Sequence, residues 1–243
     1  MEGNIPVTLI IAEAGTGHVG PNDAWRRVDA QILIEAAAKA GADMVKFQAF
    51  FDEPLFCPVE GDEKRRERWR NTFLSPGEWL NLHQHAKEAG IDLILSVFSE
   101  TGVKLLKEMK PRYVKVASRA ANSFPYHELE GPFIISTGMG KPDYVDAAWL
   151  QCTSSYPSGM VHWIAEFEGL SDHSGTIWPG LDAIFRGARF LEVHFTVPGT
   201  DPGPDRPVCL DFDQLKLLCE ARDAAATMHG NITWVEKADT GTS

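Results

Sequence analysis

The chain has 243 residues, 44% of them hydrophobic, and its 23 basic and 34 acidic residues give a net charge of −11. This size suits one domain of about 250 residues, and we expect residues 1–243 to form a single domain. The acidic balance argues against a nucleic-acid or anionic membrane partner, and the apolar runs are too short to span a bilayer.

Eight short apolar runs, each typical of a buried strand, are spread along the chain. They cover residues 7–12, 43–48, 92–98, 113–118, 133–138, 149–154, 164–171 and 190–196. Helical patterns lie between several runs and after the last, at residues 24–41, 75–90, 100–109, 178–188 and 211–230. Gly41 is the expected stop of the first helix, and Ser75, before Pro76, is the expected N-cap of the second. The alternation predicts an α/β fold, a closed parallel (β/α)8 TIM barrel.

Two connections are unusually short, from Gly138 to Ala148 and from Tyr156 to Ile164. Since a parallel crossover takes about a dozen residues or more, we expect the helices after strands five and six to be shortened or missing. The strands there would be exposed, as at many subunit interfaces, so we expect a homo-oligomer, most simply a dimer. The charged run at 60–70 is expected to form a solvated loop, with a lid over the site as the alternative.

The four cysteines show no metal-binding spacing: they are Cys57, Cys152, Cys209 and Cys219. A chain of this size does not need disulfides, so we expect reduced thiols. The first apolar run lacks the basic segment of a signal peptide. Together these features predict a cytoplasmic protein.

Polar residues collect at the carboxyl ends of the predicted strands. They include Glu13, Lys46, Gln48, Ser96, Lys115, Ser118, Ser136, Ser154, Ser171, His173 and His194. In barrels of this type, the chemistry takes place at the carboxyl ends of the strands. We therefore expect these side chains to surround one active site.

Two lysines, Lys46 and Lys115, lie in otherwise apolar strands, where each needs an opposite charge. One interpretation is a pair of buried salt bridges to Glu13 and another acid. The other is an anionic ligand with phosphate and carboxylate groups, held by the lysines and by the serine hydroxyls nearby.

Two histidines, His173 and His194, are separated by one helix and one strand, so neighbouring strands would bring both to the same rim. Paired imidazoles suit Mn²⁺, Fe²⁺, Co²⁺ or Zn²⁺ better than Mg²⁺, which prefers oxygen ligands. The alternative is two packing histidines held by hydrogen bonds. We expect a divalent metal site.

Eight motifs follow one another in a distinctive order. They are IIAEAGTGHVG, AGADMVKFQAF, KVAS, ISTGM, QCTSSYP, GLSDHSG, VHFTVPGTDPGPD and LDFDQLK. From about residue 8 to residue 222, the chain resembles the sialic acid synthase family, the NeuB-like N-acetylneuraminate synthases. The resemblance implies a transferase that condenses phosphoenolpyruvate with an N-acylated hexosamine such as N-acetylmannosamine. The products would be a nonulosonic acid and phosphate, with Mn²⁺ or a similar cation assisting.

The resemblance also implies a role for each predicted site residue. Phosphoenolpyruvate would be held by Lys46, Ser96, Lys115, Ser118, Ser136, Ser154 and Ser171. His173 and His194 would bind the metal, and Gln48 would face the reacting centre. Glu13 would orient or deprotonate the attacking water.

The chain departs from the family pattern at several positions. Where family members carry Gly-Glu, with a glutamate that grips the sugar, this chain has Arg119 and Ala120. Other departures are Gly17, Gln151, Arg206 and Cys209. Family members usually continue into a C-terminal antifreeze-like domain, whereas this sequence ends at Ser243, so we expect the catalytic barrel alone.

Three functions are consistent with these residues. The first is the synthase described above, and the second is a phosphoenolpyruvate-dependent synthase acting on a different aldehyde sugar. The third is a degenerate barrel that binds ligands without turnover. Because the chain departs from the family at positions that contact the sugar, all three functions stay open.

Overall fold

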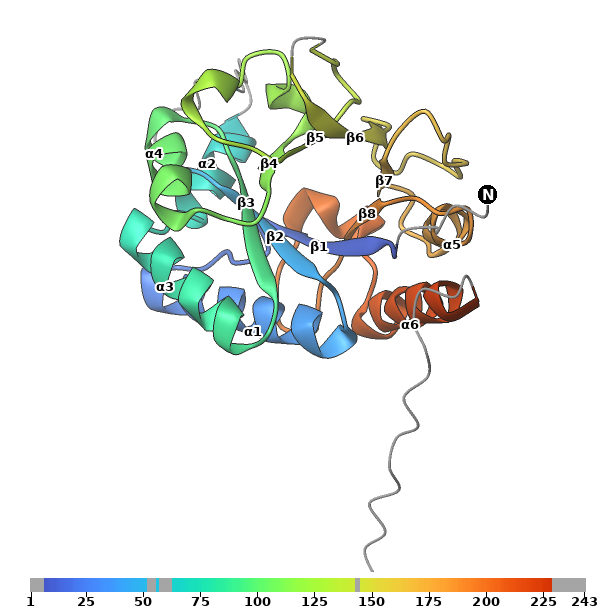
Figure 1. Cartoon of the computed structure of the whole chain (residues 1–243). Helices are drawn as coiled ribbons and strands as arrows, with labels where there is room; N and C mark the ends of the chain where they lie inside the picture. Colours follow the sequence, from blue (N-terminus) through green and yellow to red (C-terminus); the bar gives the residue numbers. More distant parts are fainter. Residues whose placement is uncertain (1–6, 52–55, 57–62, 143–144, 229–243) are drawn as a thin grey trace, which may run out of the picture.

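The computed structural model describes residues 7–51, 56, 63–142 and 145–228, which form a barrel of parallel strands with helices outside it (Figure 1). Its strands are β1 Leu9–Gly15, β2 Met44–Ala49, β3 Asp92–Val97, β4 Val114–Val116, β5 Phe133–Ser136, β6 Ala147–Cys152, β7 Gly169–Asp172 and β8 Phe190–His194. Its helices are α1 Asp23–Ala40, α2 Glu63–Asn71, α3 Pro76–Glu88, α4 Glu100–Met109, α5 Trp178–Phe185 and α6 Phe212–Met228. The predicted barrel is confirmed.

Parallel pairing runs from β3 through β2, β1, β8, β7, β6 and β5 to β4. The ends of this sheet, β3 and β4, lie beside each other without a backbone ladder between their described residues. The Ser96 hydroxyl on β3 donates instead to the Lys115 carbonyl on β4, at 3.3 Å. A side-chain hydrogen bond therefore spans the one seam that the ladder leaves open in this part of the chain.

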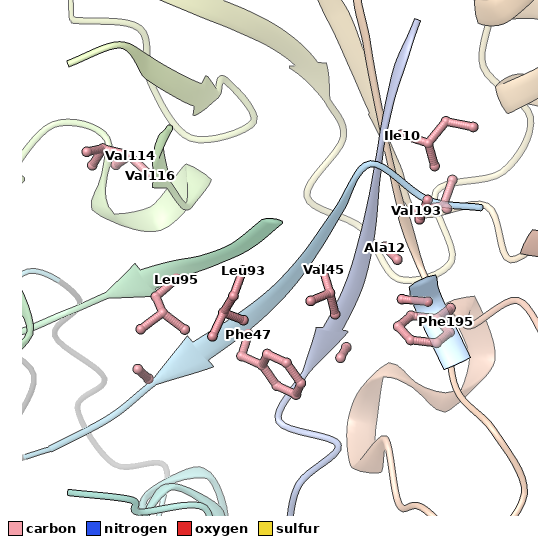
Figure 2. Close-up of a cluster of buried hydrophobic side chains, with 14 of the residues drawn as sticks. Ile10, Ala12, Val45, Phe47, Leu93, Leu95, Val114, Val116, Val193 and Phe195 are labelled. Atoms are coloured by element: carbon pink, nitrogen blue, oxygen red, sulfur yellow. The ribbon is translucent and has the colours of Figure 1, made fainter. Parts of the chain in front are cut away.

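Alternation along the strands divides the buried side chains into two sets. One set points outward against the helices, and ten of its members are labelled in Figure 2: Ile10, Ala12, Val45, Phe47, Leu93, Leu95, Val114, Val116, Val193 and Phe195. The other set fills the barrel with a separate apolar cluster: Ile11, Met44, Ile94, Tyr113, Ile134, Leu150 and Phe190. Because successive side chains on one strand face are two residues apart, the next inward layer contains Glu13, Lys46 and Ser96.

The predicted helix signals have the expected geometry. Gly41 ends α1 in the left-handed conformation with φ 94°, which glycine adopts without strain. The Ser75 side chain accepts from the Glu78 backbone at the start of α3, and the Glu78 carboxylate accepts in return from the Ser75 backbone N–H at 2.8 Å. This capping box fixes the first turn.

The crossovers after β5 and β6 contain no helix among their described residues, as predicted from their length. Lys141 covers part of this side, with its Nζ 5.1 Å from the ring centroid of Trp149 and 5.7 Å from that of Phe167. Met160 and Ile164 remain exposed in the second crossover. The outer surface of this half of the barrel is therefore covered by loops.

Two local predictions are wrong. The run at 60–70 is not a loop over its described part, because Glu63–Asn71 forms α2. Its glutamates, lysine and arginines favour a helix, and its single tryptophan, Trp69, is buried. The seventh strand begins at Gly169 rather than at residue 164, because the Phe167 N–H donates to the Ile164 carbonyl in a turn at 3.1 Å.

Within the described ranges, no helix is long and apolar enough to cross a membrane. Cys152, Cys209 and Cys219 are free thiols, and Cys57 lies outside the described residues.

Helix α4 packs closely against β3 at Gly102. An added Cβ there would lie 2.4 Å from the Val97 Cβ, whereas at Gly77 in α3 it would meet nothing within 4 Å. We expect Gly102→Ala to lower the free energy of unfolding by about 1–3 kcal/mol through overpacking. Gly77→Ala, the matched control, should be neutral or slightly stabilising. Urea denaturation of both variants tests this, and equal effects would contradict the close approach.

Candidate active site

A cavity of about 580 Å³ lies at the carboxyl ends of the strands. Ten of the eleven predicted site residues line it: Glu13, Lys46, Gln48, Lys115, Ser118, Ser136, Ser154, Ser171, His173 and His194. The eleventh, Ser96, is buried behind the lining, and the Lys46 ammonium donates to its hydroxyl at 3.4 Å. The fold thus brings the predicted residues together, with Ser96 supporting them from below.

The floor of the cavity is a network of two lysines and two glutamates. Lys46 Nζ lies 3.1 Å from Glu13 Oε2 and 2.9 Å from Glu192 Oε1. Lys115 Nζ lies 3.2 Å from Glu192 Oε2 and donates to the Ser136 hydroxyl at 2.8 Å. Each of the four charged residues is at most 4% exposed. Glu192 therefore bridges both lysines with its two oxygens, away from bulk water.

Glu192 was not among the predicted site residues. It stands on β8 two positions before His194, so both side chains face the barrel interior. The signal was present in the sequence, since a lone acid in the run FLEVH needs a partner as much as a lone lysine does. The salt-bridge interpretation of the two lysines is thus correct for the protein by itself, and Glu192 is the second acid that it required.

The network shifts the pKa values of its members in opposite directions. Burial raises the pKa of Glu13 despite the nearby ammonium of Lys46. Burial also acts against the charged form of Glu192, but Lys115 and Lys46 outweigh it and hold the pKa of Glu192 well below its usual range. The pKa of Lys46 is raised because its two carboxylates overcome the effect of burial, whereas burial lowers the pKa of Lys115 despite its ion pair with Glu192.

Hydroxyl groups from two strand ends converge above Gly138. An added Cβ at this glycine would lie 2.5 Å from the Ser154 Oγ and 3.0 Å from the Ser118 Oγ. The Ser118 Oγ is buried and has no hydrogen-bond partner within the described part of the chain. A buried hydroxyl without a partner is unfavourable unless a ligand or water supplies one. This cradle is therefore suited to a ligand rich in oxygen atoms.

The two histidines lie side by side, with ring centroids 5.2 Å apart. The Nδ1 of His173 is 2.7 Å from the Thr153 carbonyl, which only accepts hydrogen bonds, so Nδ1 carries the proton. Its Nε2 consequently has a free electron pair, which accepts from the Tyr156 hydroxyl at 3.0 Å. Burial and the neighbouring His194 lower the pKa of His173 to about 4, so its ring is neutral at pH 7.

This arrangement fits a metal ligand, because a ligating histidine is neutral and its second nitrogen is fixed by a backbone carbonyl. His194 Nδ1 lies 3.7 Å from the Asp205 carboxylate. Among the described residues, no group of three or more histidine, cysteine or acidic side chains converges as a metal site. The chain therefore offers two imidazoles, and further ligands would come from water or substrate.

Helix α2 contributes Lys64, Arg65, Arg68 and Trp69 to the lining of the cavity. These residues are not among the predicted site residues, because a charged run of this kind favours a solvated loop. Tyr156, Cys152 and Asp205 also line the cavity without having been predicted to do so. The Gln48 amide, which was predicted, donates to Glu13 Oε1 at 3.3 Å.

Comparisons with known proteins agree with the resemblance. Residues 33–233 match the model of the NeuB family. The chain is 30% identical to an N,N'-diacetyllegionaminic acid synthase of Campylobacter jejuni, over 96% of this chain and 80% of that protein. It is 31% identical to the spore coat polysaccharide biosynthesis protein SpsE of Bacillus subtilis, over 93% of this chain and 69% of that protein.

Solved structures extend the comparison. A sialic acid synthetase from Leptospira borgpetersenii, crystallised with citrate, is similar with a TM-score of 0.73 and 25% identity, covering 97% of this chain and 89% of that one. A truncated 3-deoxy-D-arabino-heptulosonate 7-phosphate synthase from Thermotoga maritima is similar with a TM-score of 0.63. At 13% identity, it shows a shared fold alone.

The floor network makes a stability prediction. Glu192→Gln removes the carboxylate that pairs with Lys115, so we expect the free energy of unfolding to fall by about 3 kcal/mol. Adding Lys115→Gln removes the unpaired charge and should restore part of the loss. Urea denaturation of wild type, both single variants and the double variant measures the coupling. Strictly additive losses would contradict a shared ion pair.

Proposed function

The chain belongs to the NeuB family, and from that premise we propose that it condenses phosphoenolpyruvate with the aldehyde of an N-acylated hexosamine, such as N-acetylmannosamine. The products are a nonulosonic acid and inorganic phosphate. The observation that carries this proposal is the buried floor network beside the histidine pair. It combines two ammonium groups, two carboxylates and two imidazoles in one cavity.

The donor would bind over the floor. Phosphoenolpyruvate carries a phosphate and a carboxylate, and Lys46 and Lys115 are the two buried cations facing the cavity. The hydroxyls of Ser118 and Ser154 at the cradle, with those of Ser136 and Ser171, would donate hydrogen bonds to its oxygens. Ser96 would act indirectly, through its hydrogen bonds to Lys46 and to the Lys115 backbone. The unpartnered Ser118 Oγ supports this assignment.

The reaction balances without any redox step. C3 of phosphoenolpyruvate bonds to the aldehyde carbon of the acceptor, and the aldehyde oxygen takes up a proton and becomes a hydroxyl group. Water adds at C2 and its oxygen becomes the new carbonyl oxygen as the bond from C2 to the phosphate oxygen breaks. One of its two protons balances the proton taken up by the aldehyde oxygen, and the other leaves on the phosphate. Glu13, oriented by the Gln48 amide, would hold or deprotonate this water. Lys46, 3.1 Å from Glu13, would stabilise the negative charge that the departing phosphate carries.

We propose His173 and His194 as the ligands of a divalent metal ion, Mn²⁺ first, with Fe²⁺, Co²⁺ and Zn²⁺ as alternatives. When bound, such an ion would polarise the acceptor carbonyl as a Lewis acid. The Thr153 carbonyl would keep the His173 ring in place, since it holds the Nδ1 proton.

We further propose a cytoplasmic homo-oligomer. The free thiols of Cys152, Cys209 and Cys219 support a reducing compartment. The exposed apolar side chains of Met160 and Ile164, on the side where the crossovers lack helices, support contact with a second copy.

Release of inorganic phosphate from phosphoenolpyruvate tests the function. With Mn²⁺ and N-acetylmannosamine, we expect acceptor-dependent release by the wild type, removed by a chelator and restored by Mn²⁺. Lys115→Gln and His173→Ala should each lower kcat by about 100-fold or more, because charges in the cavity stabilise the transition state. Lys107→Gln, a surface ion-pair variant, is the matched control and should keep full activity. If Lys115→Gln turned over as fast as the wild type, the assignment of Lys115 to phosphoenolpyruvate binding would be refuted.

A further inference from the structure

The Arg68 side chain on α2 joins the loops that follow β1 and β8. Its Nε donates to the Thr16 hydroxyl at 2.7 Å, and its Nη2 donates to the Thr16 carbonyl at 2.9 Å. The same guanidinium donates to the Asp201 carboxylate at 3.1 Å and to the Asp201 carbonyl at 2.6 Å. Because a guanidinium presents its donors in a fixed plane, these hydrogen bonds set the position of one loop relative to the other. We call the Arg68–Asp201 pair the clasp.

The loop after β8 passes close to this guanidinium. Gly203 adopts φ 59°, in the left-handed region, and an added Cβ there would clash with the Arg68 Cζ. The Asp201 carboxylate also accepts from the Gly203 backbone N–H at 3.0 Å and from Arg206 at 3.1 Å. A residue without a side chain permits both this conformation and this close approach. The local sequence of the loop is therefore matched to the clasp.

The clasped loop places one carboxylate in the cavity. Asp205 follows Asp201 by four positions, in the short 3-10 helix η3 (Gly203–Val208), and lines the cavity. Its Oδ2 lies 3.7 Å from the Nδ1 of His194, and 3.0 Å from the position that a Cβ on Gly15 would take. The carboxylate therefore lies beside the ends of β8 and β1, which are neighbouring strands.

The position of Asp205 depends on its loop rather than on a direct bond to His194. Their separation of 3.7 Å is longer than a hydrogen bond, so the interaction between them is electrostatic. Such an interaction does not fix a carboxylate in one place, and its backbone has to be held by other contacts. The clasp is such a contact, four residues before Asp205 on the same loop.

We propose that Arg68 is a positioning residue for the metal site, because its clasp on the loop keeps the Asp205 carboxylate beside His194. This inference rests on the proposed function, in which His173 and His194 hold a divalent ion. A carboxylate beside the second nitrogen of a ligating histidine orients the ring and strengthens it as a ligand, and its loss costs about 10- to 100-fold in metal affinity or activity. Arg68 acts through this carboxylate, without touching the ion.

Charge alone predicts the opposite effect on metal binding. Arg68 is positively charged and lines the same cavity as the two histidines. Removing its charge lowers the repulsion of a cation, which by itself should strengthen metal binding. Breaking the clasp releases Asp205 and should weaken metal binding. The direction of the change therefore separates the positioning role from a simple effect of charge.

Calorimetric binding of Mn²⁺ to the whole chain, without substrates, tests the inference. We expect Arg68→Gln to raise the Kd for Mn²⁺ by about tenfold, and Asp205→Asn to do the same. The double variant should lose less than about twofold more, because both changes remove one shared interaction. Arg68→Lys keeps the charge, but one ammonium group cannot replace the planar fork, so this variant should resemble Arg68→Gln.

Gly203→Ala tests the clasp without removing the guanidinium, and so serves if the Arg68 variants fail to fold. Its methyl group crowds Arg68 from the side of the loop, so its Kd for Mn²⁺ should also rise. Arg70→Gln is the matched control, since Arg70 lies on α2 but pairs with Glu63 at 2.9 Å, and its Kd should stay within about twofold. Tighter Mn²⁺ binding by Arg68→Gln, additive losses in the double variant, or an equal loss in Arg70→Gln would overturn the inference.

The phosphate-release assay keeps this inference separate from the proposed function. Losses of Mn²⁺ affinity that do not add, together with no phosphate release from any acceptor, would refute the proposed function and still support the positioning role. Phosphate release that requires Mn²⁺, with the affinity unchanged in Arg68→Gln, would refute the positioning role and leave the proposed function standing. A wild type that binds none of Mn²⁺, Fe²⁺, Co²⁺ and Zn²⁺ would refute both the metal site and the positioning role.

Discussion

Glu192 lies between Lys46 and Lys115 inside the barrel, where neither lysine has bulk water to solvate it. Without this shared carboxylate, two buried ammonium groups would repel each other on neighbouring inward positions. With it, the polar layer above the apolar cluster of the barrel becomes compatible with a folded core. The same layer is the floor of the cavity, so the ion pairs that neutralise the buried lysines also place their charges where an anionic ligand would bind.

Much of this site is predictable because β-strands alternate and parallel barrels align the carboxyl ends of their strands. Glu13, Lys46 and His194 are polar residues within or directly after apolar runs, and the fold brings all three to one cavity. The partners of buried charges are harder to predict from the sequence, because they depend on the register between strands that are distant in the sequence. Pairing of Ser171 with Glu192 on β8 emerges only once β7 and β8 are adjacent. Glu192 was overlooked for that reason, although its isolation among apolar residues was visible.

Local composition does not predict the structure of a segment whose conformation depends on contacts with distant parts of the chain. The run containing Arg68 and Trp69 is so charged that its sequence favours a solvated loop. The structure holds it as a helix at the cavity, with the Trp69 ring buried and Arg68 making four hydrogen bonds to the loops after β1 and β8. Gly138 illustrates the converse. It lies in the turn after β5, and the reason for a glycine there is the two serines that reach it from the ends of two other strands.

The seam between β3 and β4 has a mechanical consequence. Elsewhere around the described barrel, neighbouring strands are joined by rows of backbone hydrogen bonds, whereas here the Ser96 hydroxyl donates to the Lys115 carbonyl. That hydroxyl also accepts from Lys46. Because Ser96 contacts both Lys46 and the Lys115 backbone, a change in the distance between β3 and β4 would also shift the groups that hold the two lysines of the cavity floor.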